Sequence, residues 1–151
     1  MDYHIISPAD DLWLKVAAFA KSCSWSAADK LGEQMAVNDF LDWERVLVAM
    51  EGDRIAGYCT LTEKDSLTET EFTPFIGYVF VDEQFRGERL SEQMVRMASL
   101  YLERLGYSTV YIYTGHVGLY EKYGFEVVKR WMKENNEERM ILSKKIKNSH
   151  D

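Results

Sequence analysis

The chain has 151 residues, the length of one ordinary globular domain. Hydrophobic residues make up 46% and charged residues 28%, a mixture that excludes disordered and fibrous proteins. The 25 acidic and 18 basic residues give a net charge of −7, which disfavours binding to nucleic acid or to an anionic membrane. We therefore expect no nucleic-acid partner and no membrane partner.

The chain also lacks the features of a secreted, membrane or metal protein. No apolar run approaches the roughly 20 residues of a bilayer-spanning helix, and Met1–His4 does not begin a signal peptide. Cys23 and Cys59 lie far apart, which disfavours a disulfide framework. The histidines show no metal-ligand spacing with one another or with either cysteine. We expect a cytoplasmic protein without a bound metal.

Hydrophobic periodicity and turn residues predict a single domain over residues 1–146, followed by a polar tail at 147–151. Helices and strands alternate in the middle of the chain, so we expect a mixed α+β fold in which helices cover a mixed sheet. In chain order, the predicted elements are a strand at 4–6, helices at 8–21 and 26–40, strands at 45–50, 55–62 and 75–81, a helix at 90–105, a strand at 109–113, a short helix at 117–123, and strands at 125–128 and 138–142.

The loop between the strand at 75–81 and the helix at 90–105 has the composition of an anion site. A helix N-terminus presents unpaired N–H groups and the positive end of the helix dipole. Gly87 lets the backbone approach a bulky ligand, and Arg86 and Arg89 flank it. Positive charge opposes the dipole in a first helical turn, so these arginines suit phosphate binding better than helix stability. The alternative is an ordinary strand-to-helix turn with two solvated arginines.

Two further residues have both a functional and a structural explanation. Gly77 lies inside the strand at 75–81, where glycine marks a bulge, a close approach, or simple packing beneath a bulky neighbour. Tyr120 lies in the predicted helix at 117–123. A neutral phenol, with a pKa near 10, can protonate a leaving thiolate, although most tyrosines at helical spacing are core residues.

Two segments together resemble the GNAT superfamily of N-acetyltransferases, which transfer an acetyl group from acetyl-CoA to an amine. Residues 79–87, Val-Phe-Val-Asp-Glu-Gln-Phe-Arg-Gly, are similar to the family's hydrophobic strand and phosphate-binding loop. Residues 119–125, Leu-Tyr-Glu-Lys-Tyr-Gly-Phe, are similar to its carboxy-terminal signature. The resemblance extends from the first strand to about Lys145 and implies a GNAT-like fold, with a central, mostly antiparallel sheet flanked by helices.

The resemblance also implies which residues bind acetyl-CoA. Backbone groups of the strand would pair with the pantetheine arm, and loop amides would hold the pyrophosphate. Arg89 and Ser91 depart from the family's loop, which usually has glycine at the first position and glycine or alanine at the second. The expected cofactor-binding residues are Val79, Phe80, Val81, Arg86, Gly87, Glu88, Arg89, Leu90 and Ser91.

The family's general acid corresponds to Tyr120, which would protonate the departing CoA thiolate. The general base is harder to place, because residues 75–78 of the strand contain no acid. Glu71, with Glu69 nearby, lies just before that strand. We expect an ordered water, oriented by Glu71 or by backbone carbonyls, to take the proton from the amine.

The first two helices and the loop between them shape the acceptor site in this family. That region contains Trp25, Asp39 and Trp43, and acids beside aromatic faces suit a cationic amine. The expected acceptor is a small cationic molecule or a lysine-like peptide amine. The alternative is that the tryptophans are core residues and the acids are solvated.

The sequence therefore predicts direct transfer from acetyl-CoA to an amine in a ternary complex, without an acetyl-cysteine intermediate. The competing hypothesis is a catalytically weak or inactive CoA-binding regulatory module, which the altered loop and the missing carboxylate keep open. By analogy with the family, the chain could form a homodimer.

Overall fold

The computed structural model describes residues 1–22, 28–67 and 69–146. The predicted acceptor residue Trp25, the thiol of Cys23 and the tail at 147–151 therefore lie outside the described residues. In the described part of the chain, no helix is long and apolar enough to cross a membrane.

Seven strands form one sheet in the order β1-β2-β3-β4-β5-β7-β6. All neighbouring strands are antiparallel except β4 and β5, which are parallel, so the predicted mostly antiparallel sheet is confirmed. The elements are β1 (Asp2–Ile6), α1 (Leu12–Ser22), α2 (Ala28–Ala36), β2 (Arg45–Glu51), β3 (Arg54–Thr62), β4 (Phe75–Val81), the 3₁₀ helix η1 (Glu83–Phe85), α3 (Leu90–Arg104), β5 (Thr109–Thr114), the 3₁₀ helix η2 (Tyr120–Tyr123), β6 (Glu126–Met132) and β7 (Glu138–Lys145).

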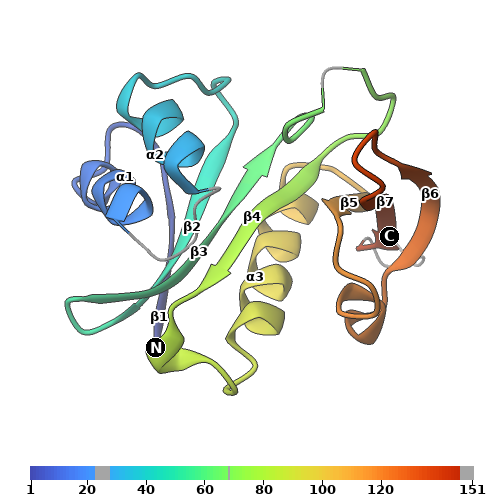
Figure 1. Cartoon of the computed structure of the whole chain (residues 1–151). Coiled ribbons are helices and arrows are strands. Elements are labelled where there is room, and N and C mark those ends of the chain that lie inside the picture. The colour runs from blue at the N-terminus through green and yellow to red at the C-terminus, as the bar shows by residue number, and fades with distance from the viewer. Residues whose placement is uncertain (23–27, 68, 147–151) are drawn as a thin grey trace.

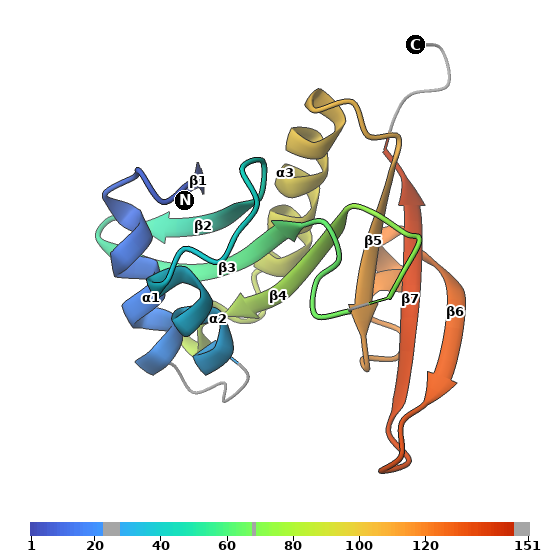
Figure 2. The same cartoon turned by 90° about the horizontal axis from the view of Figure 1, so that it is seen from above.

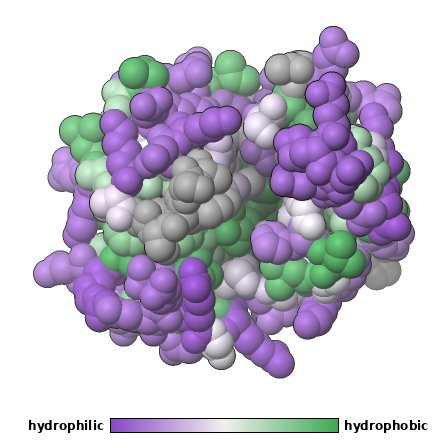
Figure 3. Space-filling model, viewed as in Figure 1, coloured by the Kyte–Doolittle hydropathy of each residue, from purple (hydrophilic) through white to green (hydrophobic). Residues whose placement is uncertain are grey.

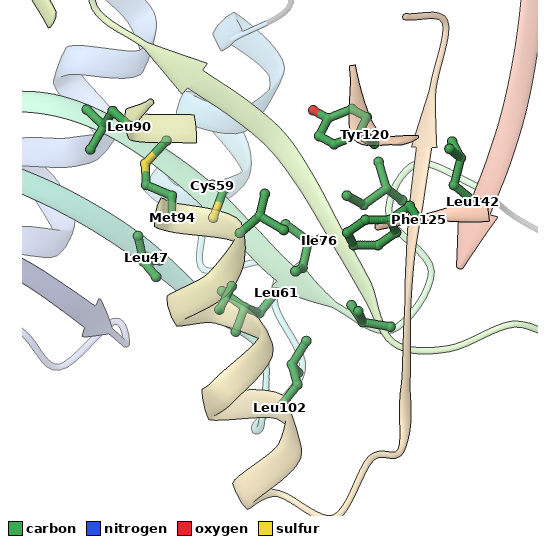
Figure 4. Packing of buried hydrophobic residues seen from close by; sticks show 14 of the residues in the cluster. Leu47, Cys59, Leu61, Ile76, Leu90, Met94, Leu102, Tyr120, Phe125 and Leu142 are labelled. Carbon is green, nitrogen blue, oxygen red and sulfur yellow. The ribbon is translucent and has the colours of Figure 1, made fainter. Parts of the chain in front are cut away.

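Helices cover both faces of the first part of the sheet, with α1 and α2 on one face and α3 on the other (Figures 1 and 2). In β2, Val46 and Val48 join the core under α1 and α2, whereas Leu47 and Ala49 join the core under α3. This explains the unbroken apolar run in β2, because a strand buried on both faces needs no polar alternation. Figure 4 shows the α3 core, in which Met94 and Leu102 point toward the sheet.

The sheet opens between its two parallel strands. β4 and β5 are paired at a single register position, Phe75 opposite Tyr111, and then diverge (Figure 2). The rest of β4, from Ile76 to Val81, therefore has no partner strand on its β5 side within the described residues. The two strands therefore form a wedge-shaped opening in the sheet, and backbone polar groups of β4 lie along one side of it.

Several predicted boundaries are wrong where a residue takes the left-handed conformation. The short helix predicted at 117–123 is only a 3₁₀ turn from Tyr120, because Gly118 has a φ of +88°. The second helix ends at Ala36 and not at residue 40, because Asn38 has a φ of +56°. The last two strands are also longer than predicted. β6 extends to Met132, because its charged residues continue the antiparallel pairing with β7.

Candidate active site

The N-terminus of α3 has no side-chain cap. Its N-cap, Arg89, has left-handed backbone (φ +59°) and provides no side-chain cap, so the first N–H groups of the helix remain available. Gly87 is also left-handed, with a φ of +86°. Arg89 occupies the loop position where the resemblance leads us to expect glycine, and it adopts the conformation that glycine favours. Left-handed backbone at an arginine costs about 1 kcal/mol of conformational free energy relative to glycine, but the loop keeps the same course.

A hollow of about 400 Å³ connects this loop with the end of β4 and with η2. Arg86 is held at its edge, because its Nε donates a 3.2 Å hydrogen bond to the carbonyl of Val81. Ser91 is fixed by a 2.6 Å hydrogen bond between its Oγ and the hydroxyl of Tyr123. Five predicted cofactor residues line this hollow: Val79, Phe80, Val81, Arg86 and Ser91. The rest of its lining consists of His116, Leu119 and Tyr120.

The side chains of several predicted cofactor residues pack elsewhere or are exposed. The side chain of Phe80 stacks on Tyr58 at a centroid distance of 5.2 Å, and Leu90 is 4% exposed in the α3 core. Glu88 is exposed in the loop before α3. The structure therefore brings the predicted strand and loop together with Tyr120, although not all of their side chains face the hollow.

Tyr120 has a buried ring at the point where the hollow begins. The residue is 5% exposed, and its ring makes edge-on contacts with Tyr123 and Phe125. Figure 4 shows the hydroxyl directed away from Phe125. Burial raises the pKa of Tyr120 well above 10, with smaller contributions from the nearby Cys59, Tyr123 and Asp65. The phenol is therefore protonated at neutral pH and can act as a hydrogen-bond and proton donor.

A second hollow, of about 610 Å³, meets the first at Val79, His116 and Tyr120. It lies within the opening between β4 and β5. Its walls come from six parts of the chain: the first turn of α2, the β3–β4 loop, β4, the end of β5 with the turn after it, η2 and the β6–β7 hairpin. The charged residues that line it are Lys30, Asp65, Lys133 and Arg139. Figure 3 shows recessed hydrophobic surface between hydrophilic parts of this face of the molecule.

Asp65 is the carboxylate of this second hollow, and sequence reasoning missed it. Its backbone is left-handed (φ +56°), and its N–H donates a 3.1 Å hydrogen bond to Oγ1 of Thr62. The carboxylate lies directly over Gly77: a Cβ at Gly77 would be 2.7 Å from Oδ2 of Asp65. Of the alternatives for Gly77, the structure therefore shows packing beneath a neighbouring side chain, and that side chain is Asp65.

The environment of Asp65 shifts its titration toward neutral pH. Burial raises the pKa of Asp65 to about 6, and a hydrogen bond from the Ser66 amide opposes the shift in part. Among the described residues, no lysine, arginine or histidine forms a salt bridge with Asp65. A carboxyl group with such a pKa is ionised above pH 6 and can accept a proton at a useful rate near neutrality.

Other predicted site residues lie elsewhere. Glu71 is exposed and lines a separate hollow, with Glu69, that does not include Tyr120. Trp43 lines neither hollow, because its ring packs against Tyr107 at a centroid distance of 5.7 Å. The prediction that Trp43 contacts the acceptor is therefore not supported.

Asp39 lines a neighbouring hollow, about 730 Å³ in volume, beside α2. That hollow shares Lys30 and Asp65 with the one in the sheet opening. A role of Asp39 in contacting an outer part of the acceptor stays a prediction.

Comparisons with known proteins agree with this geometry. A family model described as acetyltransferase (GNAT) domain matches residues 42–127. No curated protein sequence matches the chain.

Solved structures share the fold at low sequence identity. The aminoglycoside 6′-N-acetyltransferase from Enterococcus faecium is 13% identical, with a TM-score of 0.76 and 100% of both chains covered. The GNAT family N-acetyltransferase YhbS from Escherichia coli, in complex with CoA, is 23% identical, with a TM-score of 0.69, and the match covers 97% of this chain and 81% of that one.

The close approach of Asp65 to Gly77 makes a direct prediction. Gly77→Ala should lower the free energy of unfolding by about 1–3 kcal/mol, because the new methyl group collides with the Asp65 carboxylate. Asp65→Ala in the same chain should restore most of the loss. Urea denaturation of the two single variants and the double variant measures this coupling. Additive losses would show that the two residues are not in contact.

Proposed function

This chain belongs to the GNAT family of acetyl-CoA-dependent N-acetyltransferases, and we propose that it acetylates the primary amine of a small acceptor by direct attack in a ternary complex. One observation carries the proposal. Tyr120 lies where the hollow beside the α3 N-terminus meets the hollow that contains Asp65. A proton donor and a proton acceptor thus line one continuous opening, with the anion site at one end.

The binding of acetyl-CoA follows from two features of the backbone. Acetyl-CoA supplies an acetyl group activated as a thioester. The amides of residues 87–91, at the uncapped end of α3, would hold the pyrophosphate, and Arg86 and Arg89 add positive charge. Where β4 has diverged from β5, the backbone groups of Val79 and Val81 would pair with the pantetheine arm as with an added strand.

Tyr120 and Asp65 divide the two proton transfers between them. Asp65 takes a proton from the acceptor amine, directly or through one water, as the C–N bond forms. Tyr120 gives its proton to the sulfur as the C–S bond breaks. Asp65 fits the role of base better than Glu71, because it lines the same hollow as Tyr120 and Glu71 does not.

Direct transfer is supported by the state of the described cysteine. Cys59 is fully buried in the α3 core, and burial raises the pKa of its thiol to about 12. A thiol with this pKa is almost entirely protonated at neutral pH and is a poor nucleophile. Cys59 therefore forms no acetyl-enzyme intermediate.

Removal of the Tyr120 hydroxyl tests the general acid. Tyr120→Phe should lower the rate of acetyl transfer in single turnover by about 10²–10⁴-fold, the usual contribution of a positioned acid. The Kd for acetyl-CoA should stay within about twofold, as judged by calorimetry. Tyr111→Phe, which removes a phenol outside both hollows, is the matched control. An unchanged transfer rate in Tyr120→Phe would contradict the assignment, and no transfer by the wild-type protein to any amine would favour a CoA-binding regulatory module.

The raised pKa of Asp65 predicts how activity depends on pH. A base must be ionised, so Asp65 should add a limb to kcat/KM with a midpoint near pH 6, below which activity falls by about an additional tenfold per pH unit beyond the dependence set by ionisation of the acceptor amine itself. Asp65→Asn should remove this limb and lower kcat/KM by about 10²–10⁴-fold at pH 8. Glu71→Gln is the control and should change neither. If Glu71→Gln abolished the limb and Asp65→Asn did not, Glu71 would be the base.

A further inference from the structure

The hollow in the sheet opening is rich in positive charge, although the protein carries a net charge of −7. Lys30, Lys133 and Arg139 line it, and Asp65 is the only acid among its described lining residues. We infer that the acceptor carries an anionic group, a carboxylate or a phosphate, close to the amine that is acetylated. This inference rests on the proposed function and names the substrate class of the same site.

The three cations come from elements on opposite sides of the opening. Lys30 lies in the first turn of α2, Lys133 follows β6, and Arg139 lies in β7. Figure 2 shows α2 and the β6–β7 hairpin projecting to the same side of the sheet, with the divergence of β4 and β5 between them. Cations that are far apart in sequence thus face one space from two sides, an arrangement suited to clamping an anion.

Arg139 is held in place within the hollow. Its Nη1 donates a 2.9 Å hydrogen bond to the carbonyl of Glu138. A Cβ at Gly115 would be only 2.8 Å from the same Nη1, so the guanidinium lies against the backbone at the end of β5. The absence of a side chain at Gly115 gives the guanidinium room beside the acceptor space.

The positive charge is only partly neutralised. Nη2 of Arg139 donates a 2.6 Å hydrogen bond to Glu137, an exposed carboxylate whose pKa is lowered chiefly by Arg139 and more weakly by Lys133. The Glu137 carboxylate thus interacts electrostatically with both Arg139 and Lys133. Lys30 forms no salt bridge with any described residue. Within the lining of this hollow the three cations outnumber Asp65, and two further acids, Glu33 and Asp39, line the adjoining hollow beside Lys30.

This charge pattern refines the expectation of a small cationic acceptor, because the lining of the hollow favours an amine that also carries an acidic group. Glu44, the acid next to Trp43, is buried and accepts 2.7 Å hydrogen bonds from the N–H groups of Leu41 and Glu63. Its carboxylate stabilises a turn and does not face the hollow. A polycation would be repelled by the three lining cations, whereas an amine with an acidic group would satisfy both signs of charge.

Matched acceptors test the inference. The pairs are β-alanine with β-alaninamide and glucosamine 6-phosphate with glucosamine, and spermidine represents the polycations. The measured quantities are kcat/KM for acetyl transfer and the calorimetric Kd of each amine for the protein–CoA complex. The acidic member of at least one pair should be favoured about tenfold or more over its neutral partner, and the preferred pair identifies a carboxylate or a phosphate.

Variants assign this preference to the cations. Lys30→Gln and Arg139→Gln should each reduce the preference by about tenfold and leave the Kd for acetyl-CoA unchanged. Arg104→Gln, which removes an exposed arginine in the last turn of α3, should change neither quantity.

Three results would overturn the inference: equal or weaker binding of both acidic amines, a preference for spermidine, or weaker acetyl-CoA binding by Lys30→Gln and Arg139→Gln. The last would show that the cations serve the cofactor. The amine Kd values measure the charge preference even if no amine is acetylated. Tight acetyl-CoA binding without acetylation of any amine would contradict the proposed function but not the charge preference.

Discussion

The divergence of β4 from β5 is the constraint on which the rest of the structure depends. A parallel pair that separates after one register position leaves backbone polar groups without a partner strand, and such groups are costly unless water or a ligand satisfies them. The helices cannot fill the opening, because α1 and α2 pack on one face of β1–β4 and α3 on the other. The same divergence places the N-terminus of α3 at one end of the opening and the basic hollow at the other. The sheet therefore creates a site for a long, partly peptide-like anion next to a site for a small polar molecule.

Burial raises the pKa values of both residues to which we assign the proton transfers. Tyr120 is buried against the α3 core, which raises its pKa and keeps the phenol protonated. Asp65 itself has the left-handed backbone that brings its carboxylate to the opening. The carboxylate fits there because Gly77 has no side chain. Burial raises the pKa of Asp65 to about 6. The two groups thus differ in protonation at neutral pH although they line one hollow, which is the arrangement that general acid–base catalysis requires.

Local signals were enough to predict the parts of the site that lie on regular elements. The apolar run of β4 and the start of α3 at Leu90 were predicted at the observed residues, because a buried strand and an amphipathic helix leave clear periodicity. Asp65 could not be found in this way, since it lies in the polar β3–β4 loop, where nothing periodic indicates which acid turns back over the sheet. Gly77 was its one signal in the sequence. The packing of Trp43 on Tyr107 also depends on contacts distant in sequence, so its aromatic character alone suggested the wrong place.

The central claim is that the opening between β4 and β5, ending at the N-terminus of α3, binds acetyl-CoA. Calorimetric titration with acetyl-CoA of the wild-type protein, Ser91→Glu and Ser99→Glu tests it most directly. Both substitutions add one negative charge to α3, but residue 99 lies about two turns beyond the anion site. The account predicts saturable binding to the wild-type protein, at least about tenfold weaker binding to Ser91→Glu, and unchanged binding to Ser99→Glu. Absence of binding to the wild-type protein, or equal affinity for all three proteins, would contradict it.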